Sequence, residues 1–193
     1  MTFSEFEIQI RLCCDCEKRF GFKPIPIIHG DSNAKIFQIS QAPSNNVHIT
    51  KRPFNDNTGK KLKYEWYKIT DSTFYNPANF YISAFSHCFP GKNNKGGDKV
   101  PTKYCADKWL RKEMSLVDNC IYVIIGRKAS SYFFPKIEYR ELIFNDQTLN
   151  GKKTFIIPHP SPLNRDWLKK NPDFEDKRIL YIRRELWKTL NLK

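Results

Sequence analysis

Short apolar runs alternate along the chain with longer stretches whose apolar residues recur at helical spacing. Four runs indicate buried strands, because each is rich in aromatic or β-branched residues and ends in a polar or glycine-containing segment: residues 36–39, 80–85, 120–125 and 154–157. The other stretches predict helices over residues 3–22, 58–69, 102–117 and 174–190, with a further helix beginning near Lys128. This alternation predicts an α/β fold, a three-layer α/β/α sandwich around a central, mainly parallel four-stranded sheet.

The segments that follow the four predicted strands carry polar residues and short motifs. They are the loops over residues 40–46 and 86–94, the turn at Gly126 and the loop that begins at His159. In parallel sheets, ligands bind beyond the carboxyl ends of the strands, where such loops meet. We therefore expect these four segments to line one crevice.

The size and composition of the chain limit the classes of protein to which it can belong. It has 193 residues, 40% hydrophobic and 15% aromatic, which suits one folded domain over residues 1–193 rather than disorder. No apolar run approaches the ~20 residues that cross a bilayer, and the N-terminus lacks a basic segment followed by an apolar one, the pattern of a secretory signal. We expect a cytoplasmic monomer without a membrane partner, in which cysteines are ligands or buried thiols rather than disulfides.

The charge of the chain favours a polyanionic partner. Lysine and arginine number 33 against 20 acidic residues, a net charge of +13. A solubility requirement, or a genome composition that favours lysine, is the alternative explanation. Part of the charge lies in a glycine-containing loop over residues 90–101, and more follows the last predicted strand. The residues predicted to contact nucleic-acid phosphates are Lys92, Lys95, Lys99 and Arg165.

Four of the six cysteines form a candidate metal-binding set. Cys13 and Cys16 make a C-x-x-C pair, three residues apart on the predicted N-terminal helix, and Cys88 and Cys105 follow far downstream. Four thiolates can hold a [4Fe–4S] cluster or tetrahedral zinc. A zinc ribbon has a second closely spaced pair, which the separation of Cys88 from Cys105 does not provide, so the spacing favours the cluster. Ordinary buried cysteines remain the third possibility.

Several motifs, taken in order, resemble those of uracil-DNA glycosylases, and most closely the family-4 type that carries an iron–sulfur cluster. The cysteine set matches in order and approximate spacing. The other matching segments, which extend to about Arg165, are Ser40-Gln41-Ala42-Pro43-Ser44, Arg52-Pro53-Phe54 with Thr58-Gly59-Lys60-Lys61-Leu62, and His159-Pro160-Ser161-Pro162-Leu163-Asn164-Arg165. The resemblance implies a DNA glycosylase that acts in base-excision repair, hydrolyses the N-glycosidic bond of uracil or another altered base, and binds single- or double-stranded DNA.

The resemblance also implies roles for individual residues. Phe54 would stack on the flipped base, His159 would stabilise the departing base, and Ser161 would contact a DNA phosphate. Gln41 would orient water or read the base edge. The remaining candidates for the base pocket are Ser40, Ala42, Pro43 and Ala84. The alternatives are a core phenylalanine, a histidine that orders its loop, and a turn serine between two prolines.

The departures from the family pattern concern catalysis. Gln41 replaces a glutamate, Ala42 occupies the place of a water-activating aspartate, and Ala84 occupies the place of an asparagine that reads uracil. An amide cannot act as a general base, which leaves Asp56 and His48 as the nearby titratable groups. Residues 89–104 contain no histidine, so the covalent trapping of DNA by a related branch is not expected.

Three functions are therefore compatible with the sequence. One is a glycosylase, which the motifs at His159 and Phe54 favour. The second is a protein with the same fold that binds DNA, or a protein partner, without excising a base, which Gln41 and Ala84 favour. The third is a nucleic-acid-binding module stabilised by zinc, which the cysteine spacing disfavours.

Overall fold

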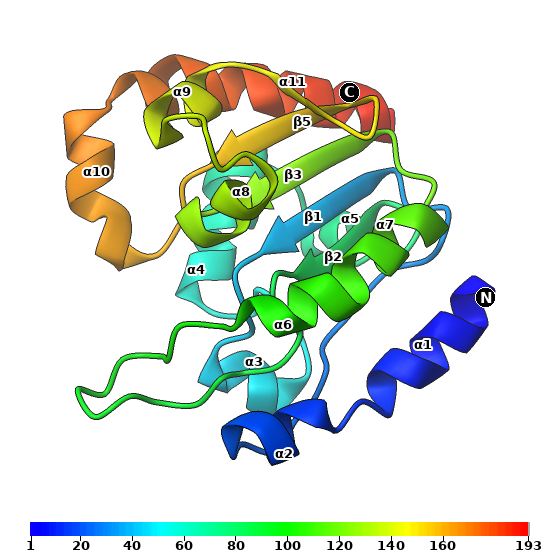
Figure 1. The fold of residues 1–193 in the computed structure, drawn as a ribbon. Helices are drawn as coiled ribbons and strands as arrows, with labels where there is room; N and C mark the ends of the chain where they lie inside the picture. Colours follow the sequence, from blue (N-terminus) through cyan, green and yellow to red (C-terminus); the bar gives the residue numbers. More distant parts are fainter. Residues whose placement is uncertain (193) are drawn as a thin grey trace.

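A five-stranded sheet forms the centre of the protein, which is described here from a computed structural model over residues 1–192 (Figure 1). The strand order is β2-β1-β3-β5-β4, and every neighbouring pair is parallel except β4 with β5. The strands are β1 (Ile36–Ser40), β2 (Phe80–Ala84), β3 (Ile121–Ile125), β4 (Gln147–Leu149) and β5 (Lys152–Ile157). The α/β architecture and the four parallel strands predicted from the apolar runs are confirmed.

Helices cover both faces of the sheet, which gives the predicted three layers (Figure 1). One side carries α6, α7 and α8, and the other carries α11, against which the segment that continues α4 packs. Their bounds are α1 (Phe3–Arg11), α2 (Asp15–Phe20), α3 (Asn45–Thr50), α4 (Asn57–Lys60), α5 (Asp71–Phe74), α6 (Lys103–Cys105), α7 (Arg111–Leu116), α8 (Arg127–Phe133), α9 (Tyr139–Phe144), α10 (Arg165–Lys170) and α11 (Ile179–Leu190). Short η segments continue several of them: η1 (Lys61–Tyr67), η2 (Ala106–Leu110), η3 (Pro162–Asn164) and η4 (Phe174–Arg178). None of the helices within residues 1–192 combines the length and apolar character that crossing a membrane requires.

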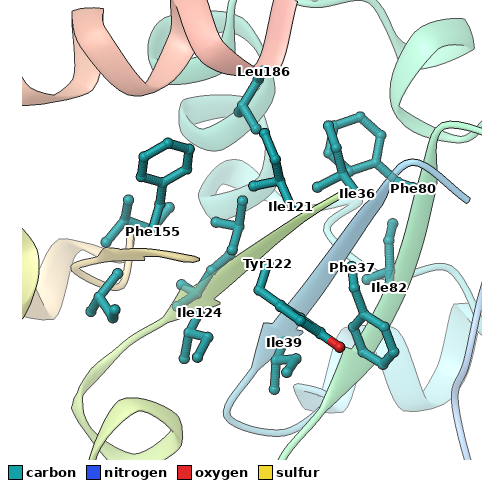
Figure 2. Packing of buried hydrophobic residues seen from close by; sticks show 14 of the residues in the cluster. Ile36, Phe37, Ile39, Phe80, Ile82, Ile121, Tyr122, Ile124, Phe155 and Leu186 are labelled. Atoms are coloured by element: carbon teal, nitrogen blue, oxygen red, sulfur yellow. The ribbon is translucent and has the colours of Figure 1, made fainter. Parts of the chain in front are cut away.

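Three of the four parallel strands are buried along their whole length because both of their faces meet helices. Every residue of β1, β2 and β3 is buried, which explains why these strands appear in the sequence as continuous apolar runs. Figure 2 shows Phe37, Ile39 and Tyr122 on one side of the sheet, while Ile121 approaches Leu186 of α11 on the other. This rigid sheet fixes the positions of the loops at its carboxyl ends.

The fifth strand is the main addition to the predicted sheet. β4 is three residues long, lies at the edge and is not fully buried, so it lacks the apolar run that identifies the other strands. Asn150 and Gly151 connect it to β5 with φ values of 50° and 72°. An Asn-Gly pair with positive φ at both residues is the usual two-residue connection of a β-hairpin. The sequence therefore contained a hairpin signal that the predicted four-stranded sheet omitted.

The helix predicted over residues 3–22 is wrong in its middle. It is two helices, α1 and α2, and α1 is capped at Leu12, where the Leu12 N–H donates to Ile8 O. Cys13 lies between the two helices and Cys14 is the N-cap of α2. Cys13 and Cys16 therefore do not share one continuous helical face. The other predicted helices are present, and the one predicted over residues 58–69 begins at Asn57 with Asp56 as its N-cap.

Candidate active site and cysteine set

A cavity of about 630 Å³ lies at the carboxyl ends of the parallel strands. Its walls come from the segments that follow β1, β2, β3 and β5, together with α4, α9 and α10. These elements gather at the end of the sheet toward which the strand arrows point in Figure 1. The predicted convergence of the loops on one crevice is confirmed. The predicted site residues that line it are Ser40, Gln41, Ala42, Pro43, Phe54, Ala84, Lys99, His159 and Ser161.

The loop after β1 is held against β2 by backbone hydrogen bonds. Phe85 N–H donates to Ser40 O at 2.8 Å, and Ser86 N–H donates to Gln41 O at 3.1 Å. The Ser40 hydroxyl donates to Ser83 O at 3.3 Å. These bonds leave the Gln41 side chain half-buried at the cavity wall and place the small side chain of Ala84 beside it. Position 84 therefore contributes only a methyl group to the cavity wall.

The loop after β5 fixes the orientation of His159. Ser161 N–H donates to Nδ1 of His159 at 3.3 Å, and the Asn164 side-chain amide donates to His159 O at 2.7 Å. Since Nδ1 accepts a hydrogen bond, it carries no proton, and the neutral ring has its proton on Nε2. Burial lowers the pKa of His159 from 6.5, while the negative charge of Asp56 opposes that shift. His159 therefore offers a neutral Nε2–H donor at the cavity.

Asp56 and Phe54 belong to one tight turn that also lines the cavity. Asp56 Oδ1 accepts the Gly59 N–H at 3.0 Å and so caps α4. Phe54 has a φ of 54°, and a side chain at Gly59 would overlap the carbonyl group of Phe54. Tyr75 ties the turn to the body of the protein, because its hydroxyl donates to Pro53 O and Phe54 O at 2.8 and 3.1 Å. The turn places a carboxylate within electrostatic range of His159.

Phe54 both packs in the core and lines the cavity. Its side chain is 9% exposed, and its ring meets Phe74 edge-on with centroids 6.0 Å apart. His48, the other titratable group considered beside Asp56, does not line the cavity. Its ring lies 5.8 Å from that of Phe89. Of the two titratable side chains that could replace the general base, Asp56 and His48, only Asp56 lines the cavity.

The predicted DNA-contact residues divide into two groups. Lys99 lines the cavity, whereas Lys92, Lys95 and Arg165 are exposed outside it. The loop between Pro90 and Pro101 projects from the body as a long hairpin (Figure 1). Lys92 pairs within this loop with Asp98, with Nζ and Oδ1 2.6 Å apart. The hairpin therefore presents its remaining positive charge at the rim of the cavity.

Further residues that line the cavity, and that were not predicted as site residues, include Arg127, Tyr139, Leu163 and Trp167. The Arg127 guanidinium lies 4.5 Å from the centre of the Tyr139 ring. Leu163 lies in the His159 loop and is 94% exposed, the highest value among the large hydrophobic side chains of residues 1–192. Arg127 follows the predicted Gly126 turn and Leu163 lies within a recognised motif, so both had local signals. Tyr139 and Trp167 reach the cavity only through the packing of α9 and α10.

The structure brings the predicted cysteine set together from three parts of the chain. Cys16, Cys88 and Cys105 are buried and Cys13 is half-buried, whereas Cys14 and Cys120 are exposed. A hydrogen bond between the Cys16 and Cys88 thiols lowers the pKa of Cys16 to about 7. Cys105 belongs to a small apolar cluster with Phe6, Ile10, Ile28 and Trp109, against which Cys13 packs. Cys16, Cys88 and Cys105 thus lie close to one another, and Cys13 packs against the apolar cluster that contains Cys105.

The arrangement of these thiols bears on which metal group would suit them. Within residues 1–192, no three His, Cys, Asp or Glu side chains are arranged to hold a single metal ion. In a cubane cluster each thiolate binds its own iron atom, so the sulfur atoms are spread more widely than around one ion. Four thiols from three parts of the chain, three of them buried, could supply such a donor set.

Comparison with known proteins agrees with the α/β fold. The family model described as "Uracil DNA glycosylase superfamily" matches residues 27–183. The chain is also 26% identical over 163 residues to the type-4 uracil-DNA glycosylase of Saccharolobus solfataricus, an alignment that covers 79% of this chain and 73% of that protein. The matched residues include the whole sheet and all four loops at its carboxyl ends. The chain therefore belongs to the uracil DNA glycosylase superfamily.

Proposed function

We propose that residues 1–193 act as a single DNA glycosylase domain that excises uracil or another altered base by hydrolysing the N-glycosidic bond. The observation that carries this proposal is the arrangement of His159 and Asp56 in one cavity, with a neutral Nε2–H donor near a carboxylate. Membership of the superfamily and the similarity to a type-4 uracil-DNA glycosylase support it. The exposed positive charge at the rim suits a DNA partner.

Excision requires the base to leave the helical stack and enter the cavity. The Phe54 ring offers an apolar face there. Leu163 is exposed beside the opening, where it can fill the gap that a flipped nucleotide leaves in a duplex. Lys99 and Arg127 line the same cavity and supply positive charge for the flanking phosphates.

The reaction breaks the bond between C1′ of the sugar and the ring nitrogen of the base. The bonding electrons leave with the base, and the Nε2–H of His159 stabilises the resulting negative charge by donating a hydrogen bond to a carbonyl oxygen. Asp56 is the group that takes over the role of the missing carboxylate: it holds a water molecule and accepts its proton as the water oxygen bonds to C1′. Gln41 positions that water but accepts no proton.

The cysteine set would hold a [4Fe–4S] cluster through Cys13, Cys16, Cys88 and Cys105. The bound cluster would cross-link the N-terminal helices to the segments that follow β2 and precede η2. The burial of Cys16, Cys88 and Cys105, and the lack of a second closely spaced cysteine pair in the sequence, support a cluster over zinc.

One observation favours a second function, the binding of DNA without excision. Ala84 and Gln41 leave the cavity without the asparagine and the glutamate of the family pattern. An alkali-cleavage assay on single- and double-stranded oligonucleotides that contain uracil, hypoxanthine or xanthine separates the two functions. Strand cleavage after incubation supports the glycosylase and names its base. Salt-sensitive binding of the same oligonucleotides without cleavage would overturn the glycosylase in favour of the binding protein.

A further inference from the structure

A cluster of buried polar side chains connects the cavity wall to the cysteine set. It consists of Ser83 on β2, His87 in the following segment and Glu113 on α7, which are 2%, 1% and 0% exposed. Ser83 lines the cavity, and His87 directly precedes Cys88. The proposed reaction uses none of the three residues. We call them the Ser83–His87–Glu113 cluster.

The hydrogen bonds of this cluster surround Glu113 with donors. Its Oε2 is 2.8 Å from both Nε2 of His87 and the Ser83 hydroxyl, and its Oε1 accepts the Tyr81 hydroxyl at 3.0 Å. A carboxylate buried without partners costs several kcal/mol. Three convergent donors offset that cost, so Glu113 is held in one position. The bond from Nε2 then sets the orientation of the imidazole ring.

The other side of the ring faces a cysteine. His87 Nδ1 lies 3.2 Å from the Cys105 sulfur, and the His87 backbone N–H donates to the same sulfur at 3.4 Å. Among residues 1–192, no other cysteine sulfur has a histidine ring as a hydrogen-bond partner. Cys105 is thereby distinguished from the other three thiols. With both ring nitrogens protonated, His87 would donate from Nε2 to Glu113 and from Nδ1 to a thiolate at Cys105, which would also accept the His87 backbone N–H.

We propose that His87 is a positioning residue for Cys105 as a cluster ligand, and that Glu113 and Ser83 hold the His87 ring in the required orientation. The inference rests on the [4Fe–4S] cluster that is proposed above. Hydrogen bonds that a ligand atom receives from surrounding groups orient it and affect how tightly the metal is retained. Hydrogen bonds to the sulfur atoms of a cluster also contribute to its reduction potential. Loss of the ring donor should therefore make the cluster both easier to remove and harder to reduce.

Two substitutions at position 87 distinguish the effect of losing the hydrogen bond to the Cys105 sulfur from the effect of losing the packing of the ring. The side-chain amide of asparagine can reach the place of Nδ1, whereas that of glutamine reaches the place of Nε2. Both are made in a Glu113→Gln background, since removing one partner of a buried ion pair leaves an uncompensated charge. We expect His87→Gln to release iron to a chelator about tenfold faster than the Glu113→Gln parent. His87→Asn should release iron at the rate of the parent.

The midpoint potential, measured by a redox titration followed by electron paramagnetic resonance, gives a second readout. We expect a lower potential for His87→Gln than for His87→Asn, because only glutamine loses the donor to Cys105. Tyr67→Phe is the matched control: it removes a buried hydrogen bond of 2.9 Å to Gln38, in the main core and away from the cysteines. It should change neither iron release nor potential.

The possible outcomes distinguish failure of the proposed role of His87 from failure of the proposed [4Fe–4S] cluster. A wild-type protein that binds iron, with equal iron release and equal potentials in the two position-87 variants, would overturn the role of His87 and leave the cluster in place. A wild-type protein that binds no iron under anaerobic reconstitution would overturn both. Thermal unfolding of each variant shows whether the two remain equally folded.

Discussion

The backbone N–H of Ser161 donates a hydrogen bond to Nδ1 of His159 at 3.3 Å. This single contact sets the chemistry available at the cavity, because a ring that accepts at Nδ1 and is neutral must carry its proton on Nε2. A neutral donor can stabilise a departing anionic base without itself losing a proton. The two prolines that flank Ser161 restrict the backbone of the loop and so help to keep the contact in place.

The pKa of His159 gives a prediction for stability. Burial lowers it below 6.5 in the folded protein, so protonation is easier in the unfolded chain. The resulting stabilisation is complete above pH 6.5 and is lost as the pH falls from 6.5 through the folded pKa. His159→Asn removes this contribution. We expect the difference in free energy of unfolding between wild type and His159→Asn, measured by urea unfolding, to shrink from pH 7.5 to pH 5.5. A difference that grows over this range would contradict the assignment.

Asp56→Asn tests the proposed acceptor of the water proton. Asparagine caps a helix about as well as aspartate, so the Gly59 N–H keeps a partner and the free energy of unfolding should change by less than about 0.5 kcal/mol. The single-turnover excision rate should fall about 10²- to 10⁴-fold, because an amide cannot accept the proton. Excision by Asp56→Asn at the wild-type rate would exclude Asp56 from this role.

Leu163→Ala tests whether this side chain supports base flipping. Since Leu163 is 94% exposed, its truncation should leave thermal unfolding unchanged. Excision from duplex DNA should slow by about tenfold, equivalent to ~1.4 kcal/mol of lost apolar contact with the bases. Single-stranded DNA needs no such wedge, so the rate on it should remain near that of wild type. An equal loss on both substrates would assign Leu163 to another step.

Cys88→Ser tests the cysteine set, and Cys120→Ser is its control because Cys120 is exposed and outside the set. The first variant should lose most of its iron and its broad visible absorbance, whereas the second should retain both. Loss of the cross-link should also lower the free energy of unfolding by roughly 2 kcal/mol, which corresponds to a drop in the melting temperature of ~4–8 °C. Iron at the wild-type level in Cys88→Ser would remove this residue from the proposed ligands.

The sequence predicts those parts of the fold that have a local signal. Strand β3 is a continuous apolar run because helices cover both of its faces, so its burial is visible in the sequence. Strand β4 is short and lies at the sheet edge, where pairing with β5 rather than composition defines it. The break between α1 and α2 was missed because the apolar residues on either side continue a helical pattern through Leu12 and Cys13.

The same distinction holds for the site. His159 and Phe54 lie in short motifs, which identify them without a structure. Tyr139 reaches the cavity because α9 packs beside α8, a contact that no local pattern encodes. The pair of His87 and Glu113 is separated by 26 residues and depends on the packing of α7 against β2. A buried glutamate in a predicted helix resembles any solvent-exposed one until its three-dimensional neighbours are known.

The excision rate of His159→Asn tests the central claim most directly. The measurement is single-turnover release of the base from a single-stranded oligonucleotide at pH 7.5, with DNA affinity determined in parallel. Because asparagine cannot reach the place of Nε2, we predict excision by the wild-type protein and a rate about 10²- to 10³-fold lower for His159→Asn at unchanged affinity. Equal rates for the two proteins, or wild-type protein that binds each altered oligonucleotide and releases no base, would contradict the account.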